Sequence, residues 1–197
     1  MKKFKPSLKT REIIRTELGF NEEDWVYLFL GRLNRDKAIL DLVSTFSEIK
    51  TDYNQKLIFV GHDEENLVSG REKEFKNNNI LLVPFSNKPE VILQACDTFC
   101  LPINREGFGL SVIEASALAK PIICSDIYGL KNTIKENTKG IRHKKGDSQD
   151  LKRQLAYALN NIELMNTMGA NSRNYVEEHF SDTLVLKEWL RFYGNSL

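Results

Sequence analysis

The chain has 197 residues, of which 41% are hydrophobic and 28% charged, and this composition is typical of a globular protein with one full core. The formal net charge of +1 gives no field that would attract nucleic acid or an anionic membrane. Three cysteines, Cys96, Cys100 and Cys124, lack the spacing of a zinc site. Their apolar surroundings predict buried, reduced thiols. No apolar run follows the basic start of the chain, so neither a signal peptide nor a spanning segment is predicted.

Apolar runs alternate with helix-forming runs along the chain. A short helix is predicted from Ser7 to Leu18, closed by Gly19. Strands are predicted at 25–30, 56–60, 80–83, 98–101, 121–124 and 140–143. Helices are predicted at 39–49, 64–76, 89–95 and 112–118, and in three segments beyond Asp147. This alternation predicts an α/β fold, a single Rossmann-like domain whose parallel sheet of about six strands has helices on both faces, followed by C-terminal helices.

The stretch from Arg105 to Ala115 follows the fourth predicted strand and opens a helix. Its glycine loop leaves backbone N–H groups exposed at the helix entrance, where the helix dipole also favours an anion. The two glutamates, Glu106 and Glu114, add acceptors that suit hydroxyl groups. We therefore predict a site for a phosphate or carboxylate beside hydroxyl groups, at the carboxyl edge of the sheet.

Two basic residues, Arg32 and Lys37, follow the first predicted strand and should lie at the same edge. Fixed cations at this position could neutralise a diphosphate. The simpler alternative is that both are solvated surface charges. His62 and His143 also follow strands, and we expect both to be surface histidines.

Two motifs carry a family resemblance. The segment GRLNRDK at 31–37 and the segment EGFGLSVIEASALAKPII, with its E-x7-E motif, resemble the signature of retaining glycosyltransferases of family 4 (glycosyltransferase group 1), which have the GT-B fold. The resemblance implies that residues 1–197 are the C-terminal, donor-binding domain, with the N-terminal acceptor domain absent. The parent enzyme would move a sugar from a UDP- or GDP-linked donor to an acceptor hydroxyl in polysaccharide or glycoconjugate synthesis.

The resemblance also implies residue roles. Arg32 and Lys37 would stabilise the leaving nucleoside diphosphate, so that no metal and no cofactor are needed. Glu106 would lie near the donor sugar and Glu114 would accept hydrogen bonds from the ribose. The donor phosphates would be bound at the helix entrance, formed by Gly107, Phe108, Gly109 and Leu110. The nucleobase would lie near Pro84 and Phe85.

The chain departs from the family pattern at several positions. Ala38 and Ala119 stand where glycine is common, Tyr128-Gly129 replaces a glycine pair, and Asn132 stands where glutamate is frequent. Partners implied are the nucleotide-sugar donor and the missing acceptor domain, with no nucleic acid. The last helix, with Trp189 and Tyr193, would cross to that domain and should expose its apolar face. A cytoplasmic location is expected, and attachment of the parent enzyme to the inner face of the membrane stays open.

Two other functions fit less of the sequence. A non-catalytic nucleotide-sugar binding module, or a subunit completed by a separate acceptor-binding chain, would need the same donor site. A dinucleotide-dependent oxidoreductase is the third reading, because Gly107-Phe108-Gly109 mimics part of its glycine fingerprint. That loop follows the fourth strand instead of the first, and it lacks the third glycine.

Overall fold

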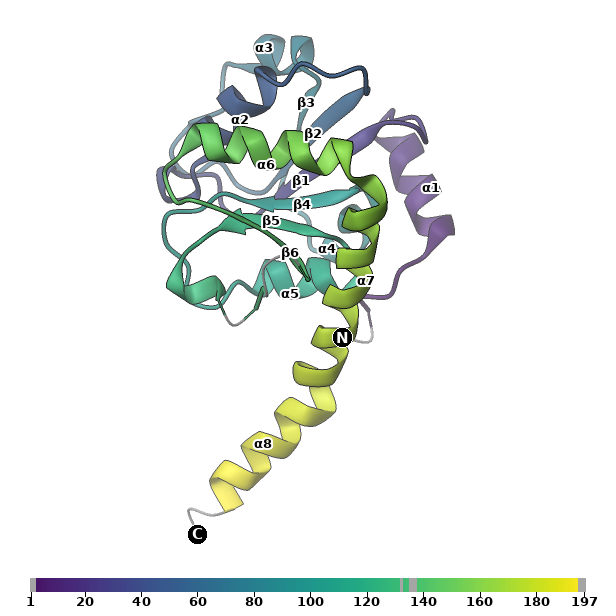
Figure 1. The fold of residues 1–197 in the computed structure, drawn as a ribbon, viewed down its shortest axis with the longest axis vertical. Helices are drawn as coiled ribbons and strands as arrows, with labels where there is room; N and C mark the ends of the chain where they lie inside the picture. The colour runs from purple at the N-terminus through teal and green to yellow at the C-terminus, as the bar shows by residue number, and fades with distance from the viewer. Residues whose placement is uncertain (1–2, 132, 135–137, 195–197) are drawn as a thin grey trace.

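A single parallel sheet forms the centre of the computed structural model, which describes residues 3–131, 133–134 and 138–194 (Figure 1). Its strand order is β3-β2-β1-β4-β5-β6. The strands are β1 (Trp25–Leu30), β2 (Gln55–Val60), β3 (Ile80–Val83), β4 (Thr98–Leu101), β5 (Ile122–Ser125) and β6 (Gly140–His143). All five neighbouring pairs are parallel. The predicted α/β class, strand number and strand direction are therefore confirmed.

Helices connect the strands and close the chain. They are α1 (Leu8–Glu17), α2 (Ile39–Ser47), α3 (Glu72–Asn77), α4 (Pro89–Ile92), α5 (Leu110–Ala117), α6 (Ser148–Asn160), α7 (Ile162–His179) and α8 (Asp182–Gly194). Short 3-10 turns lie at Arg35–Lys37, Leu93–Ala95 and Tyr128–Leu130. The Ser7 hydroxyl accepts the Thr10 N–H, as expected of a helix cap.

The predicted helix over 64–76 is wrong in its first half, because only Glu72–Asn77 is helical there. The Asp63 carboxylate accepts the backbone N–H groups of Leu67, Val68 and Ser69. These bonds give the backbone an alternative to the helical ladder. A polar segment can therefore be ordered without being a helix.

The chain covers both faces of the sheet because its crossovers leave the centre in opposite directions. Right-handed crossovers from β1 to β2 and from β4 to β5 place α2 and α5 on opposite faces. Helix α6 returns to pack against α2, and α7 packs against α5. A buried hydrogen bond, 2.7 Å from the Tyr27 hydroxyl to the Leu155 carbonyl, fastens α6 to β1.

The strand order reverses between β1 and β4, which lie side by side at the centre of the sheet. At such a switch point the loops after the two strands diverge and open a crevice at the carboxyl ends. Here the two loops touch, since the Asn104 N–H donates to the Asp36 carbonyl at 2.8 Å. The loop that carries Lys37 and the loop that carries Glu106 are thus held together.

Helix α8 leaves the body of the domain and points away from the sheet (Figure 1). Its large apolar side chains are exposed, with Trp189 at 60% and Tyr193 at 56%. The expected exposure of this apolar face is confirmed. Among the helices within the described ranges, none combines the length and apolar character needed to cross a membrane.

Candidate functional site

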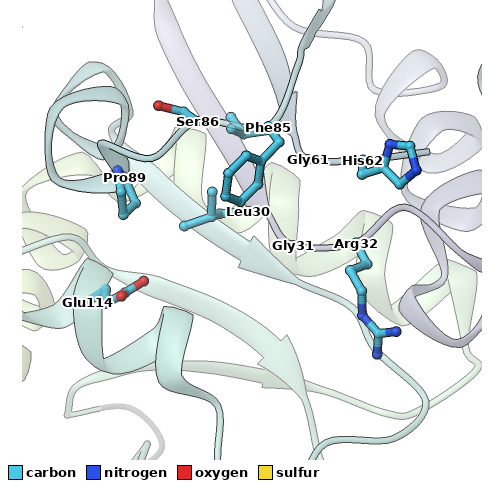
Figure 2. A pocket seen from close by; sticks show the side chains of 10 residues that line it. Leu30, Gly31, Arg32, Gly61, His62, Phe85, Ser86, Pro89 and Glu114 are labelled. Carbon is cyan, nitrogen blue, oxygen red and sulfur yellow. The ribbon is translucent and has the colours of Figure 1, made fainter. Parts of the chain in front are cut away.

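A cavity of about 260 Å³ lies at the carboxyl ends of the central strands. Its lining includes Leu30, Gly31, Arg32, Val60, Gly61, His62, Phe85, Ser86, Pro89 and Glu114. Figure 2 shows the Phe85 ring beside Leu30, with Glu114 on one side of the cavity and Arg32 on the other. Residues from four separate segments therefore meet at this cavity, and Arg32, Phe85 and Glu114 are the predicted site residues among them.

Glycines allow the loops after β1 and β2 to run close together. A Cβ on Gly61 would overlap the carbonyl oxygen of Gly31. Beyond them the backbones remain paired, because the Leu33 N–H donates to the His62 carbonyl at 2.8 Å. Gly31 and Gly61 therefore line the cavity with backbone alone.

Lys37 and Glu106, which are 69 positions apart in the chain, form an ion pair at this edge. Lys37 Nζ lies 3.0 Å from Glu106 Oε2, and the two side chains are 15% and 23% exposed. Glu106 Oε1 also accepts the Gly107 N–H at 3.0 Å. Burial by itself would raise the pKa of Glu106, but Lys37 and the loop N–H groups outweigh it and hold the pKa below its usual value. Glu106 is therefore ionised.

The entrance of α5 depends on two close approaches. Gly109, which precedes the helix, has φ +71°, where a side chain would be strained and would meet Leu130. A Cβ on Gly129 would overlap the Glu106 carbonyl oxygen. Phe108 packs edge-on against Phe180 with ring centroids 5.7 Å apart, so its side chain braces the loop. Gly107 and Leu110 are exposed, which leaves this entrance open to a ligand.

Glu114 lies within α5 and faces the cavity. Burial, together with the negative charge of Glu90, raises its pKa above the usual value. A carboxylate in this position gains from hydroxyl donors that would replace lost water. Arg32, on the opposite side, is 68% exposed and lies 3.3 Å from Glu64.

Two of the family departures have a backbone cost in this structure. Ala38 has φ +50° and Ala119 has φ +56°, which is the left-handed region that favours glycine. Glycine at these positions would adopt the same backbone without strain. Tyr128 is 88% exposed, next to the Gly129 that contacts the Glu106 loop. Asn132 lies outside the described residues.

The histidine expectation is correct for one residue and wrong for the other. His62 is exposed, and it also lines the cavity. His143 is 3% exposed, with Nε2 3.1 Å from Ser125 Oγ and Nδ1 3.1 Å from the Lys144 carbonyl. Burial lowers its pKa, so the ring is neutral, donates from Nδ1 and accepts from Ser125. It sits in the hydrogen-bonded interior because the chain turns back over it after β6.

The predicted base-binding residues, Pro84 and Phe85, are both exposed and together border a depression next to the cavity. Phe85 also lines the cavity itself. Ser86 and Pro89 line the cavity but were not predicted. The sequence held a signal for them, since Ser86 lies in the loop after β3 and Pro89 opens α4, at the carboxyl edge where ligands bind.

The sequence was compared with protein-family models. Residues 10–175 match the family described as Glycosyl transferases group 1. The chain belongs to this family. The predicted membership of glycosyltransferase group 1 is therefore confirmed, and the predicted fold agrees with that of glycosyltransferase structures.

Relatives and solved structures agree with this assignment. The capsular polysaccharide biosynthesis glycosyltransferase CapM of Staphylococcus aureus is 31% identical over 179 residues, which are 89% of this chain and 47% of CapM. The crystal structure of Anabaena HepE in complex with UDP and glucose superposes with a TM-score of 0.87 at 19% identity, over 100% of this chain and 54% of HepE. The structure of sucrose-phosphate synthase from Thermosynechococcus elongatus superposes with a TM-score of 0.86 at 24% identity, over 98% of this chain and 50% of the synthase. The chain spans about half the length of the curated relatives it matches.

Proposed function

We propose that this glycosyltransferase domain binds the donor, a UDP- or GDP-linked sugar, for a retaining, metal-independent transfer to an acceptor hydroxyl in polysaccharide or glycoconjugate synthesis. A second domain, not part of this chain, would bind the acceptor. Two observations carry the proposal: Arg32 and Glu114 line the cavity at the carboxyl ends of the strands, and Lys37 pairs with Glu106 between the loops that follow β1 and β4. In HepE the ligands named are UDP and glucose, which supports the same donor class here.

The geometry suggests a role for each group. The exposed Phe85 ring offers a face on which a nucleobase can stack, and Glu114 can accept both hydroxyls of a ribose. Lys37, Arg32 and the N–H groups at the entrance of α5 would carry the diphosphate. Because charge develops on the leaving diphosphate as the sugar bond breaks, cations held at this position stabilise the transition state more than the ground state. Glu106, adjacent to Lys37, would orient the sugar.

The diphosphate site is tested by titrating wild type, Arg32→Ala and Lys37→Ala with UDP and uridine, and with GDP and guanosine. Charged hydrogen bonds contribute roughly 1.5–3 kcal/mol each, so removal of Lys37 should weaken diphosphate binding by about 10- to 150-fold. Arg32 is more exposed, and its effect should fall near the lower end. Nucleoside affinity should barely change. Arg35→Ala is the matched control, because Arg35 is 85% exposed on the same loop.

Two outcomes of these titrations would contradict the proposal. Unchanged diphosphate affinity in both variants would mean that the two cations are ordinary surface charges. Binding that disappears on addition of EDTA would contradict the metal-independent mechanism. The role of Glu114 is tested with Glu114→Ala. This variant should lose more affinity for a ribonucleoside diphosphate than for its 2′-deoxy analogue. Equal losses of affinity for the two ligands would mean that Glu114 does not bind the ribose hydroxyls.

The second candidate function is a binding module without catalysis, and it has the same donor site. The share of the relatives that this chain spans favours the first candidate, in which a further domain completes the enzyme. We expect the chain alone to bind donor but not to transfer sugar. Measurable transfer from a UDP- or GDP-sugar to an added saccharide by this chain would contradict that expectation.

A further inference from the structure

Both cations of the candidate diphosphate site are already paired with carboxylates of the same chain. Lys37 lies 3.0 Å from Glu106, and Arg32 Nη1 lies 3.3 Å from each carboxylate oxygen of Glu64. Within each pair the two charges cancel, so each cation is partly neutralised before an anion binds. Glu106 belongs to the predicted site, whereas nothing in the sequence motifs points to Glu64.

Glu64 is held in place without the help of Arg32. Its Oε2 accepts from Asn34 Nδ2 at 2.9 Å, and its backbone N–H donates to the Leu33 carbonyl at 3.1 Å. Asn34 is 9% exposed and fixed in the loop after β1. The hydrogen bond from Asn34, followed by that from Arg32, holds the pKa of Glu64 below its ordinary value. An ionised carboxylate therefore stays at this position when Arg32 moves.

Arg32, in contrast, is held loosely. Its side chain is 68% exposed, and a single guanidinium nitrogen is shared between the two oxygens of Glu64. Bidentate pairing, which would be stronger, is not used. Arg32 lines the cavity, and Figure 2 shows its side chain extending from the end of β1 at the side opposite Glu114. A diphosphate in the cavity can therefore compete for this side chain.

We propose that Glu64 is an internal counter-ion that pairs with Arg32 and that a nucleoside diphosphate must displace from it. The inference rests on the proposed function, in which Arg32 contacts the diphosphate. Glu64 would then weaken binding of the donor, and it would recapture Arg32 when the diphosphate product leaves. The residue acts through Arg32 and touches no reacting atom.

The test is the affinity of Glu64→Gln for the diphosphate that wild type binds, UDP or GDP. Glutamine can still accept from Asn34 and Arg32 but carries no charge, so the local geometry is kept. Exposed ion pairs are weak, so we expect a gain of roughly two- to fivefold in diphosphate affinity, with nucleoside affinity unchanged. The gain should shrink at high salt, since exposed charges are screened. A damaged site would lose affinity, so a gain cannot come from damage.

Glu65→Gln is the matched control. It removes the same charge from the neighbouring position, where Glu65 pairs with the exposed Arg35 at 3.5 Å. The gain in Glu64→Gln should exceed that in Glu65→Gln, and the difference should disappear in an Arg32→Ala background. If Glu64→Gln also loses nucleoside affinity, Glu64→Ala, which equally lacks the charge, replaces it in the same titrations.

The outcomes separate the two proposals. If Arg32→Ala binds the diphosphate as tightly as wild type, Arg32 is outside the site and both proposals about it are wrong. If Arg32→Ala weakens binding but the Glu64 variants bind no more tightly than Glu65→Gln, or keep their advantage without Arg32, the counter-ion role alone is overturned.

Discussion

The Lys37–Glu106 pair should stabilise the folded domain as well as form part of the site. With 15% and 23% of the two side chains exposed, the pair lies between a surface ion pair and a buried one. Surface pairs contribute about 0–1 kcal/mol, and breaking a buried pair costs about 3–5 kcal/mol. We therefore expect a coupling of roughly 1–2 kcal/mol in the free energy of unfolding. For a domain of this size each kcal/mol corresponds to about 2–4 °C in Tm.

The measurement is a double-mutant cycle in urea at about pH 7, with Lys37→Met, Glu106→Gln and the double variant. The control cycle is Lys152–Glu48, which has the same N–O distance of 3.0 Å with 34% and 53% exposure. That pair should give a coupling below about 0.5 kcal/mol, because exposure weakens it. The comparison isolates the effect of partial burial.

The coupling should also depend on pH in a defined direction. The pKa of Glu106 is lower in the folded protein than the unfolded value of about 4.3. The contribution of the pair is therefore complete above the unfolded pKa and is lost as the pH falls through the folded pKa. Additive single variants at pH 7, or equal couplings in the two cycles, would refute the reasoning that burial strengthens this pair.

Three further predictions follow from buried or crowded positions. The pKa of His143 is lower in the folded protein than in the unfolded one, so stability should fall as the pH drops below about 6.5, by at most about 1.4 kcal/mol per pH unit, until the folded pKa is reached. His143→Gln should reduce the pH dependence of the urea midpoint over this range, with the exposed His62→Gln as the control. An unchanged pH dependence would contradict the prediction. Gly129→Ala should displace the Glu106 loop and weaken nucleoside diphosphate binding at least about tenfold, while the nucleoside binds nearly as before. If the variant binds the diphosphate as tightly as wild type, the loop tolerates the added Cβ. Cys96, Cys100 and Cys124 are fully buried, and burial raises the pKa of Cys96 to about 11. Thiol reagents should therefore label these cysteines in the native protein only as fast as the domain unfolds or opens locally. Rapid labelling before unfolding would count against their burial.

Most of the fold could be predicted because a buried strand requires a continuous run of apolar residues, which is visible in the sequence. The run Trp25–Leu30 is apolar throughout and is covered on both faces, and Gly140–His143 forms the sixth strand as predicted. The segment over 64–71 could not be predicted from periodicity. Its conformation depends on the Asp63 side chain bonding to nearby N–H groups, and polar composition alone does not distinguish that arrangement from a helix.

Part of the site was equally accessible to prediction. Arg32, Lys37, Glu106 and Glu114 follow β1 and β4, and parallel strands bring the residues after them to one edge. Their detailed partners were not accessible. The burial of His143 and the position of Phe85, without Pro84, in the cavity wall depend on how the loops pack against each other.

The sequence by itself determined the alternation of strands and helices, the parallel sheet and the edge at which charged residues gather. Those features follow from local hydrophobic patterns and from the handedness of crossovers, which act over short stretches of chain. Only the tertiary structure decided that Lys37 meets Glu106 and that Arg32 meets Glu64, at separations of 69 and 32 residues. Such contacts depend on loop conformations set by hydrogen bonds to Asn34, Asp36 and Gly107, and no local pattern records them.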